Sequence, residues 1–138
     1  MTRVVDGDTL DVAAGDGRTV RVRLHAVDAP ESNQPGGQAA THQVRTWIHE
    51  TGGGSVKVIP TAVDQHGRTV ARIEAGGVDL GRALVGECLV WVDKRFCGAY
   101  CRANYLPAAK TCRREKRGLW AGKKPIAPAA WRAGKRPR

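Results

Sequence analysis

The stretch from Val20 to Glu31 constrains what this chain can fold into more than any other part of it. Its first half alternates apolar and polar side chains, with Val20, Val22 and Leu24 on one face. This period of two predicts a strand that buries one face in a core. The strand leads into a turn with two carboxylates, Asp28 and Glu31. A strand that presents arginines and ends in such a turn can hold a cation, a water molecule and a phosphate together.

Further short strands, separated by tight turns, are predicted on both sides of this stretch. Alternating apolar residues and turn-forming Asp-Gly pairs predict strands at 2–6, 10–12, 19–26, 56–59 and 68–74. Apolar residues at helical spacing predict helices at 38–49, after Asp79, and from Pro107 to about Arg117. We expect Pro60 to end the fourth strand. Closely spaced strands with tight turns indicate an α+β domain built on a small closed barrel.

Basic residues are concentrated at the C-terminal end of the chain. Residues 110–138 contain eleven Lys and Arg against one acidic residue, which accounts for the whole net charge of +10. Such a block favours a polyanionic partner such as nucleic acid, and a solvated basic tail is the alternative. Arg113, Arg114 and Arg117 on the last predicted helix are candidate nucleic-acid contacts. We expect one domain at 1–120, followed by an irregular, Pro/Ala-rich basic tail at 121–138.

Four cysteines, an even number in a small domain, permit two disulfides in three connectivities. We favour Cys97–Cys101 together with Cys88–Cys112, of which the second would join one helix to another. Fully reduced core cysteines are the alternative, whereas a zinc site lacks the usual ligand spacing. Because disulfides form in oxidising compartments, we expect a secreted or periplasmic protein.

No membrane association is expected, because no apolar run approaches the roughly 20 residues that a membrane-spanning helix needs. No signal peptide is visible. Met1 lies only a few residues before the first motif, so we expect that the natural chain begins earlier. The default expectation is a monomer, and no protein partner is implied.

Five polar residues lie beside the predicted strands and turns: Asp8, Arg23, Asp28, Glu31 and Arg68. Two carboxylates from separate loops form an incomplete set of ligands, which a hard cation such as Ca²⁺ completes with carbonyl, water and phosphate oxygens. Arginines can fork onto phosphate oxygens as charge develops there, and a carboxylate near the metal can activate water. Singly, each residue has an ordinary structural role in a turn or on a strand. Together they have the composition of a site that cleaves phosphodiesters.

Several segments, with their order and spacing, resemble the staphylococcal nuclease (thermonuclease) family. They are Val4-Val-Asp-Gly-Asp-Thr-Leu10, Val22-Arg-Leu-His-Ala-Val-Asp-Ala-Pro-Glu31, Gly37-Gln-Ala-Ala40, Asp64-Gln-His-Gly-Arg68 and Gly118-Leu-Trp120. The ending Pro128-Ala-Ala-Trp-Arg132 is similar to that of bacterial relatives. The resemblance therefore extends from about residue 2 to residue 132.

This resemblance implies a five-stranded OB-fold β-barrel with three α-helices. It also implies calcium-dependent hydrolysis of DNA and RNA with little sequence specificity. The implied metal ligands are Asp8, Asp28 and the backbone carbonyl of Ala29. The implied phosphate contacts and general base are Arg23, Arg68 and Glu31.

Two positions depart from the family's pattern, Ala29 and His66, of which the second stands where tyrosine is often found and contacts the nucleotide. Many members have threonine where this chain has Ala29, but a ligand provided by the backbone carbonyl survives that change. Members that serve as nucleic-acid-binding OB-fold modules without catalysis have typically lost the acidic and arginine positions. Such a module is the alternative to an enzyme, and the presence of all five charged side chains favours the nuclease.

Overall fold

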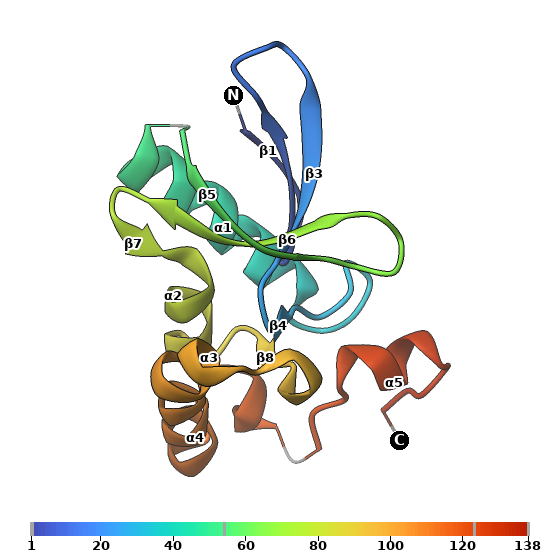
Figure 1. Cartoon of the computed structure of the whole chain (residues 1–138). Coiled ribbons are helices and arrows are strands. Elements are labelled where there is room, and N and C mark those ends of the chain that lie inside the picture. Colours follow the sequence, from blue (N-terminus) through green and yellow to red (C-terminus); the bar gives the residue numbers. More distant parts are fainter. Residues whose placement is uncertain (1, 54, 123, 138) are drawn as a thin grey trace.

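Three strands at the N-terminal end form an antiparallel meander: β1 (Thr2–Asp6), β2 (Thr9–Ala13) and β3 (Thr19–Leu24). The structure is a computed structural model that describes residues 2–53, 55–122 and 124–137. The other strands are β4 (Val27–Asp28), β5 (Lys57–Val63), β6 (Thr69–Ala75), β7 (Val78–Asp79) and β8 (Trp91–Val92). The helices are α1 (Gly37–Gly52), α2 (Leu80–Gly86), α3 (Ala99–Asn104), α4 (Leu106–Glu115) and α5 (Pro128–Arg132), with 3₁₀ turns η1 (Lys94–Phe96) and η2 (Gly118–Ala121) (Figure 1).

The main sheet has the strand order β1-β2-β3-β6-β5, and β7 pairs with β6. All of its pairings are antiparallel except that of β3 with β6, which are separated in the chain by α1 and β5. In Figure 1 the β1–β3 meander stands across the β5–β6 hairpin. The α+β class and a sheet with five principal strands are confirmed. Among the described residues the pairings form an open path, with no ladder between β5 and β1 that would close a barrel.

Both α1 and α2 pack against the sheet, and together they supply about a third of the buried core formed by the described residues. The predicted apolar stripe of α1 is confirmed, because Ala40, Val44 and Ile48 are buried. Asp79 begins α2 as predicted: its carboxylate accepts a hydrogen bond from the Arg82 backbone N–H at 3.1 Å. This packing fixes the sheet against the helices and gives the loops at the end of β3 a rigid base.

Four local predictions are wrong. Pro60 does not end the fourth strand, because β5 continues to Val63 through a register irregularity between Pro60 and Ala62, where a missing N–H is tolerated. No helix was predicted around Cys101, where the structure has α3, and the tail predicted to be irregular contains α5. Arg117 lies beyond α4, because that helix ends at Glu115.

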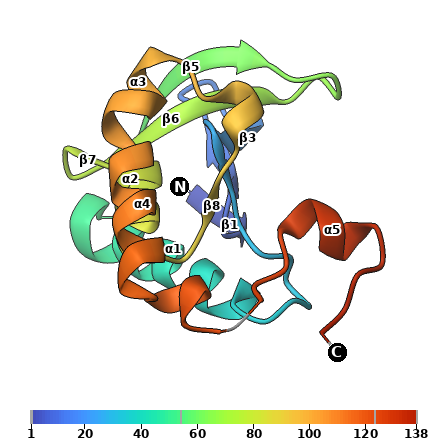
Figure 2. The same ribbon diagram turned by 90° about the horizontal axis from the view of Figure 1, so that it is seen from below.

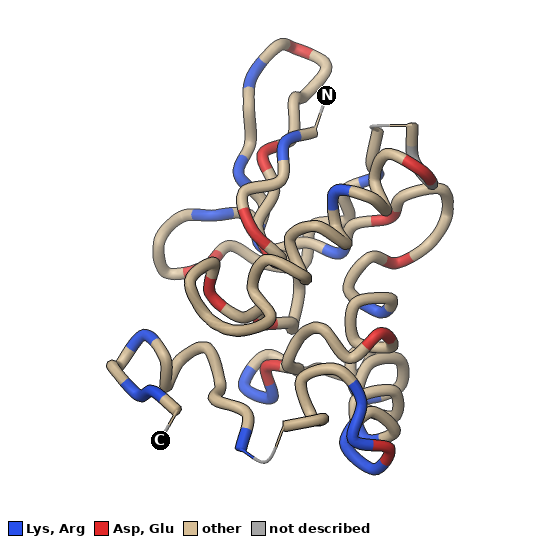
Figure 3. The backbone as a smooth tube through the Cα atoms, turned by 180° about the vertical axis from the view of Figure 1, so that it is seen from behind, with Lys and Arg blue, Asp and Glu red and all other residues tan. Residues whose placement is uncertain are grey.

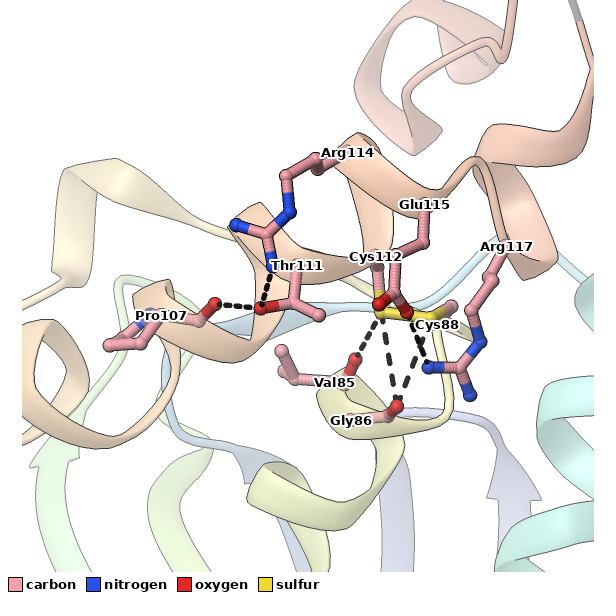
Figure 4. Close-up of a disulfide and its surroundings, with 9 residues drawn as sticks. All are labelled: Val85, Gly86, Cys88, Pro107, Thr111, Cys112, Arg114, Glu115 and Arg117. Carbon is pink, nitrogen blue, oxygen red and sulfur yellow. Dashed lines mark hydrogen bonds and ion pairs between the residues drawn. A yellow bond between two sulfur atoms is a disulfide. The ribbon is translucent and has the colours of Figure 1, made fainter.

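Two disulfides tie the helices together. The structure joins Cys88 to Cys112 and Cys97 to Cys101, the same partners that the sequence analysis favoured. Figure 4 shows the first bridge between α2 and α4, with the Cys112 sulphur 3.2 Å from the Val85 carbonyl oxygen. Gly118 packs so closely on Cys88 that a Cβ there would lie 2.3 Å from the Cys88 carbonyl oxygen. The bridge therefore ties the end of α2 to α4, and the packing of Gly118 adds η2 to the same contact.

No helix in the described ranges is long and apolar enough to cross a membrane.

Candidate active site

The turn between β1 and β2 places Asp8 at the centre of the site. Gly7 allows this, because a Cβ at that position would lie 2.8 Å from the side chains of both Ala29 and Ala40. Asp8 is 8% exposed. Its carboxylate accepts hydrogen bonds from the Thr9 hydroxyl and the Ala29 backbone N–H, each at 2.9 Å. These bonds hold Asp8 against the segment that follows β4.

Arg23 on β3 connects two carboxylates from separate segments. Its Nη1 lies 3.3 Å from an oxygen of Asp8, and its Nη2 donates to Asp28 at 3.3 Å. Nη1 also donates to the Val27 carbonyl oxygen at 2.6 Å, which fixes the guanidinium at the end of β4. The Arg23 side chain is only 19% exposed. Two buried acids thus share one partly buried cation, which holds their carboxylates on a common centre.

Burial shifts both carboxylates toward their neutral forms. It raises the pKa of Asp8 to about 7, although the Arg23 guanidinium lowers it. Burial likewise raises the pKa of Asp28, against the opposing charges of Arg23 and Arg132. The nearby guanidinium charges therefore do not compensate for the hydration that the two carboxylates lose on burial. A divalent cation bound by both groups would favour their ionised forms.

The donor set at this centre suits a hard cation rather than zinc. Across the described ranges, no three His, Cys, Asp or Glu side chains gather closely enough to enclose a metal ion. What the site offers is two carboxylates, with Ala29 next to Asp28 in the chain and its backbone N–H bonded to Asp8. A Ca²⁺ ion takes six to eight oxygens, so such a set fits it only with water and substrate oxygens added. The residues therefore fit an open metal site.

Glu31 lies at the rim of the same centre, with its side chain 32% exposed. Its backbone N–H donates to the Gln34 side-chain oxygen at 3.0 Å, and its carboxylate accepts a short hydrogen bond from Arg132. Gly37 packs against it so closely that a Cβ there would overlap the Glu31 carbonyl oxygen. The start of α1 therefore fixes the backbone that carries this carboxylate.

Arg68 lies on the same side of the sheet as Arg23 but makes a separate ion pair. Val70 on β6 is the register partner of Arg23, and Arg68 lies two residues before Val70. The period of two therefore places both arginines on one face. The Arg68 Nε donates to Asp64 at 2.7 Å. The structure thus brings four of the five predicted polar residues into one contact network and leaves Arg68 beside it.

The predicted nucleic-acid contacts are divided between two places. Arg113 packs on the Trp120 ring, 4.5 Å from its centroid, and lines an open groove together with Asp28, Trp91, Lys94 and other residues. Arg114 and Arg117 are not among the residues that line that groove, and Arg117 pairs with Glu115. Figure 3 shows basic residues gathered at the end of α4 and again in the last segment of the chain.

Arg132 is the site residue that sequence reasoning missed. Its ion pair with Glu31 joins positions 101 residues apart, so no local pattern indicates it. The only feature of the sequence that pointed to this region is the ending Pro-Ala-Ala-Trp-Arg, and it indicates no chemical role for Arg132.

Comparison with known proteins gives a consistent result. Residues 21–122 match the family described as staphylococcal nuclease homologue. A protein named micrococcal nuclease from Shigella flexneri is 32% identical over 141 residues, covering 96% of this chain and 78% of that protein. A protein named as an uncharacterized endonuclease from Escherichia coli is 31% identical over 134 residues, covering 96% and 82%. A staphylococcal-like nuclease from Arabidopsis thaliana is 29% identical over 116 residues, which is 84% of this chain and 34% of that protein.

Proposed function

Because the chain belongs to the staphylococcal nuclease family, we propose that it is a calcium-dependent nuclease that hydrolyses the phosphodiester bonds of DNA and RNA with little sequence preference. One observation carries this proposal: two buried carboxylates, Asp8 and Asp28, converge on one guanidinium, with Glu31 at the rim. A domain that only binds nucleic acid gains nothing from two desolvated acids at a centre that a polyanion approaches.

In this proposal Asp8, Asp28 and the carbonyl of Ala29 hold the metal ion. Bound Ca²⁺ supplies a Lewis acid that polarises the phosphodiester and offsets its charge. The chain contributes the geometry, because Arg23 and the Ala29 N–H fix the two carboxylates before substrate arrives. Preorganised groups of this kind need little rearrangement as charge develops in the transition state.

The remaining residues act on the phosphate and the attacking water. Glu31 accepts a proton from the water and is the general base. Arg23 and Arg68 donate to phosphate oxygens, on which negative charge increases during attack. All these contacts are to backbone phosphate or water, which carry no base identity, so little sequence preference is expected.

We also propose that the protein works outside the cytoplasm. Its four cysteines form two disulfides, and such bonds persist in oxidising compartments.

Replacing Arg68 with lysine is expected to lower kcat/KM by about 10- to 100-fold, somewhat less than the 10²–10³ typical of removing a transition-state donor outright. An ammonium keeps the charge but cannot reproduce the planar fork of donors. Initial rates on single-stranded DNA measure this effect.

Arg18 provides a matched control for this variant. Like Arg68, it follows a glycine with positive φ, and its Nε donates to an aspartate of the same turn, Asp16, at 2.6 Å. It lies at the opposite end of β2 and β3 from Asp8 and Arg23. Arg18→Lys should therefore cleave normally, and an equal loss in both variants would refute the role assigned to Arg68.

A further inference from the structure

Arg132 stands in direct contact with the catalytic carboxylates, although it comes from the far end of the chain. We propose that Arg132, carried by α5, is a third phosphate-binding arginine of the active site and contacts the backbone of the bound strand beside the scissile phosphate. This inference rests on the proposed nuclease function. The C-terminal segment then contributes a substrate-binding residue to the site and is more than a solvated tail.

The segment around α5 is anchored to the loop that follows Glu31. The Gln34 side-chain amide donates to the Ile126 carbonyl oxygen at 2.5 Å, and the Trp131 indole N–H donates to the Asn33 side-chain oxygen at 3.0 Å. Trp131 is 9% exposed. In Figures 1 and 2, α5 stands apart from the group formed by α2, α3 and α4, on the side of β3 and β4. These contacts fix α5 as a wall of the site.

The guanidinium of Arg132 is placed between two site carboxylates. Nη1 donates a short hydrogen bond to Glu31, and Nη2 lies 3.9 Å from an oxygen of Asp28. Half of the Arg132 side chain is exposed, whereas Arg23 is 19% exposed. A guanidinium has five N–H donors in a planar fork. Arg132 can therefore keep its ion pair with Glu31 and still present donors to an oxyanion from solvent.

Electrostatics favour this role for Arg132. Asp28 and Glu31 repel the phosphates of an approaching strand, and a cation between them reduces that repulsion while attracting the strand. The opposite interpretation is a latch, in which Arg132 blocks Glu31 until α5 leaves. The burial of Trp131 and Pro128 favours a fixed wall over a segment that leaves readily.

Binding of a single-stranded DNA oligonucleotide in EDTA, measured by fluorescence anisotropy at several salt concentrations, tests the contact without catalysis. Arg132→Ala should weaken binding and reduce the slope of log K against log salt by about 0.7, the value for one phosphate contact on a single strand. Arg132→Lys should keep the slope, because it keeps the charge. Arg18→Ala removes the same charge at the far end of the β2–β3 hairpin and should leave the slope unchanged.

Cleavage with calcium gives the second readout. Arg132→Ala should raise KM and lower kcat/KM at least about tenfold, with an unchanged melting temperature showing that the variant folds. An unchanged salt slope in Arg132→Ala overturns the proposal, and so does faster cleavage, which would identify a latch. If the unaltered protein fails to cleave, the proposed nuclease function is lost, while the salt slope still decides whether Arg132 contacts phosphate.

Discussion

Glu31→Gln is expected to reduce kcat on single-stranded DNA by about 10²–10⁴-fold, the usual contribution of a general base. Glutamine keeps the size of the side chain and an oxygen that can accept from Arg132, but it does not accept a proton from water. The loss should therefore appear in kcat with little change in KM. Initial rates at saturating calcium over a range of DNA concentrations separate the two constants.

Two controls distinguish loss of the base from damage to the site. Glu87→Gln changes an exposed carboxylate beyond α2 and should leave kcat unaltered. Calcium binding by Glu31→Gln, measured by calorimetry, should stay within a few-fold of the unaltered protein, because Glu31 is not among the proposed ligands. A variant that retains more than a tenth of the original kcat would exclude Glu31 as the base.

Removal of the Cys88–Cys112 disulfide is expected to lower the free energy of unfolding by about 3 kcal/mol, in line with a bridge that closes a loop of 24 residues. This bridge joins α2 to α4, and both of its cysteines are buried. Denaturant unfolding of Cys88→Ser/Cys112→Ser measures the loss as a shift of the midpoint.

The second disulfide is the matched comparison for the first. Cys97 and Cys101 are only four residues apart, so their bridge restricts the unfolded chain less. Cys97→Ser/Cys101→Ser should therefore lower the free energy of unfolding by less, about 2 kcal/mol or below. If this short bridge proves to be the more stabilising of the two, the account of how the helical part is held is wrong.

The elements that could be predicted are those whose signal lies within the element itself. The alternation in β3, the apolar stripe of α1 and the capping residue Asp79 each need only neighbouring residues. The same holds for the central stretch, where Arg23 and Asp28 lie five residues apart and meet in the structure. Local pattern was sufficient there because one strand and one turn bring the groups together.

What could not be predicted depends on distant packing. Pro60 was expected to end a strand, but its neighbours on β6 continue the ladder past it. The helix α5 is only five residues long and rich in Pro and Ala. Its segment is held in place by contacts to Asn33 and Gln34, which lie nearly a hundred positions earlier in the chain. Arg132 enters the site through those contacts. The residues next to Arg132 in the sequence do not indicate those contacts, so only the folded chain shows that Arg132 pairs with Glu31.

The central claim is that this protein cleaves nucleic acid and does not merely bind it. The most direct test is to incubate the unaltered protein with single-stranded DNA in calcium and in EDTA, and to separate the products on a denaturing gel. The account predicts degradation in calcium, none in EDTA, and recovery when excess calcium is added back. Protein that binds the DNA but leaves it intact in calcium would contradict the account and identify a nucleic-acid-binding module instead.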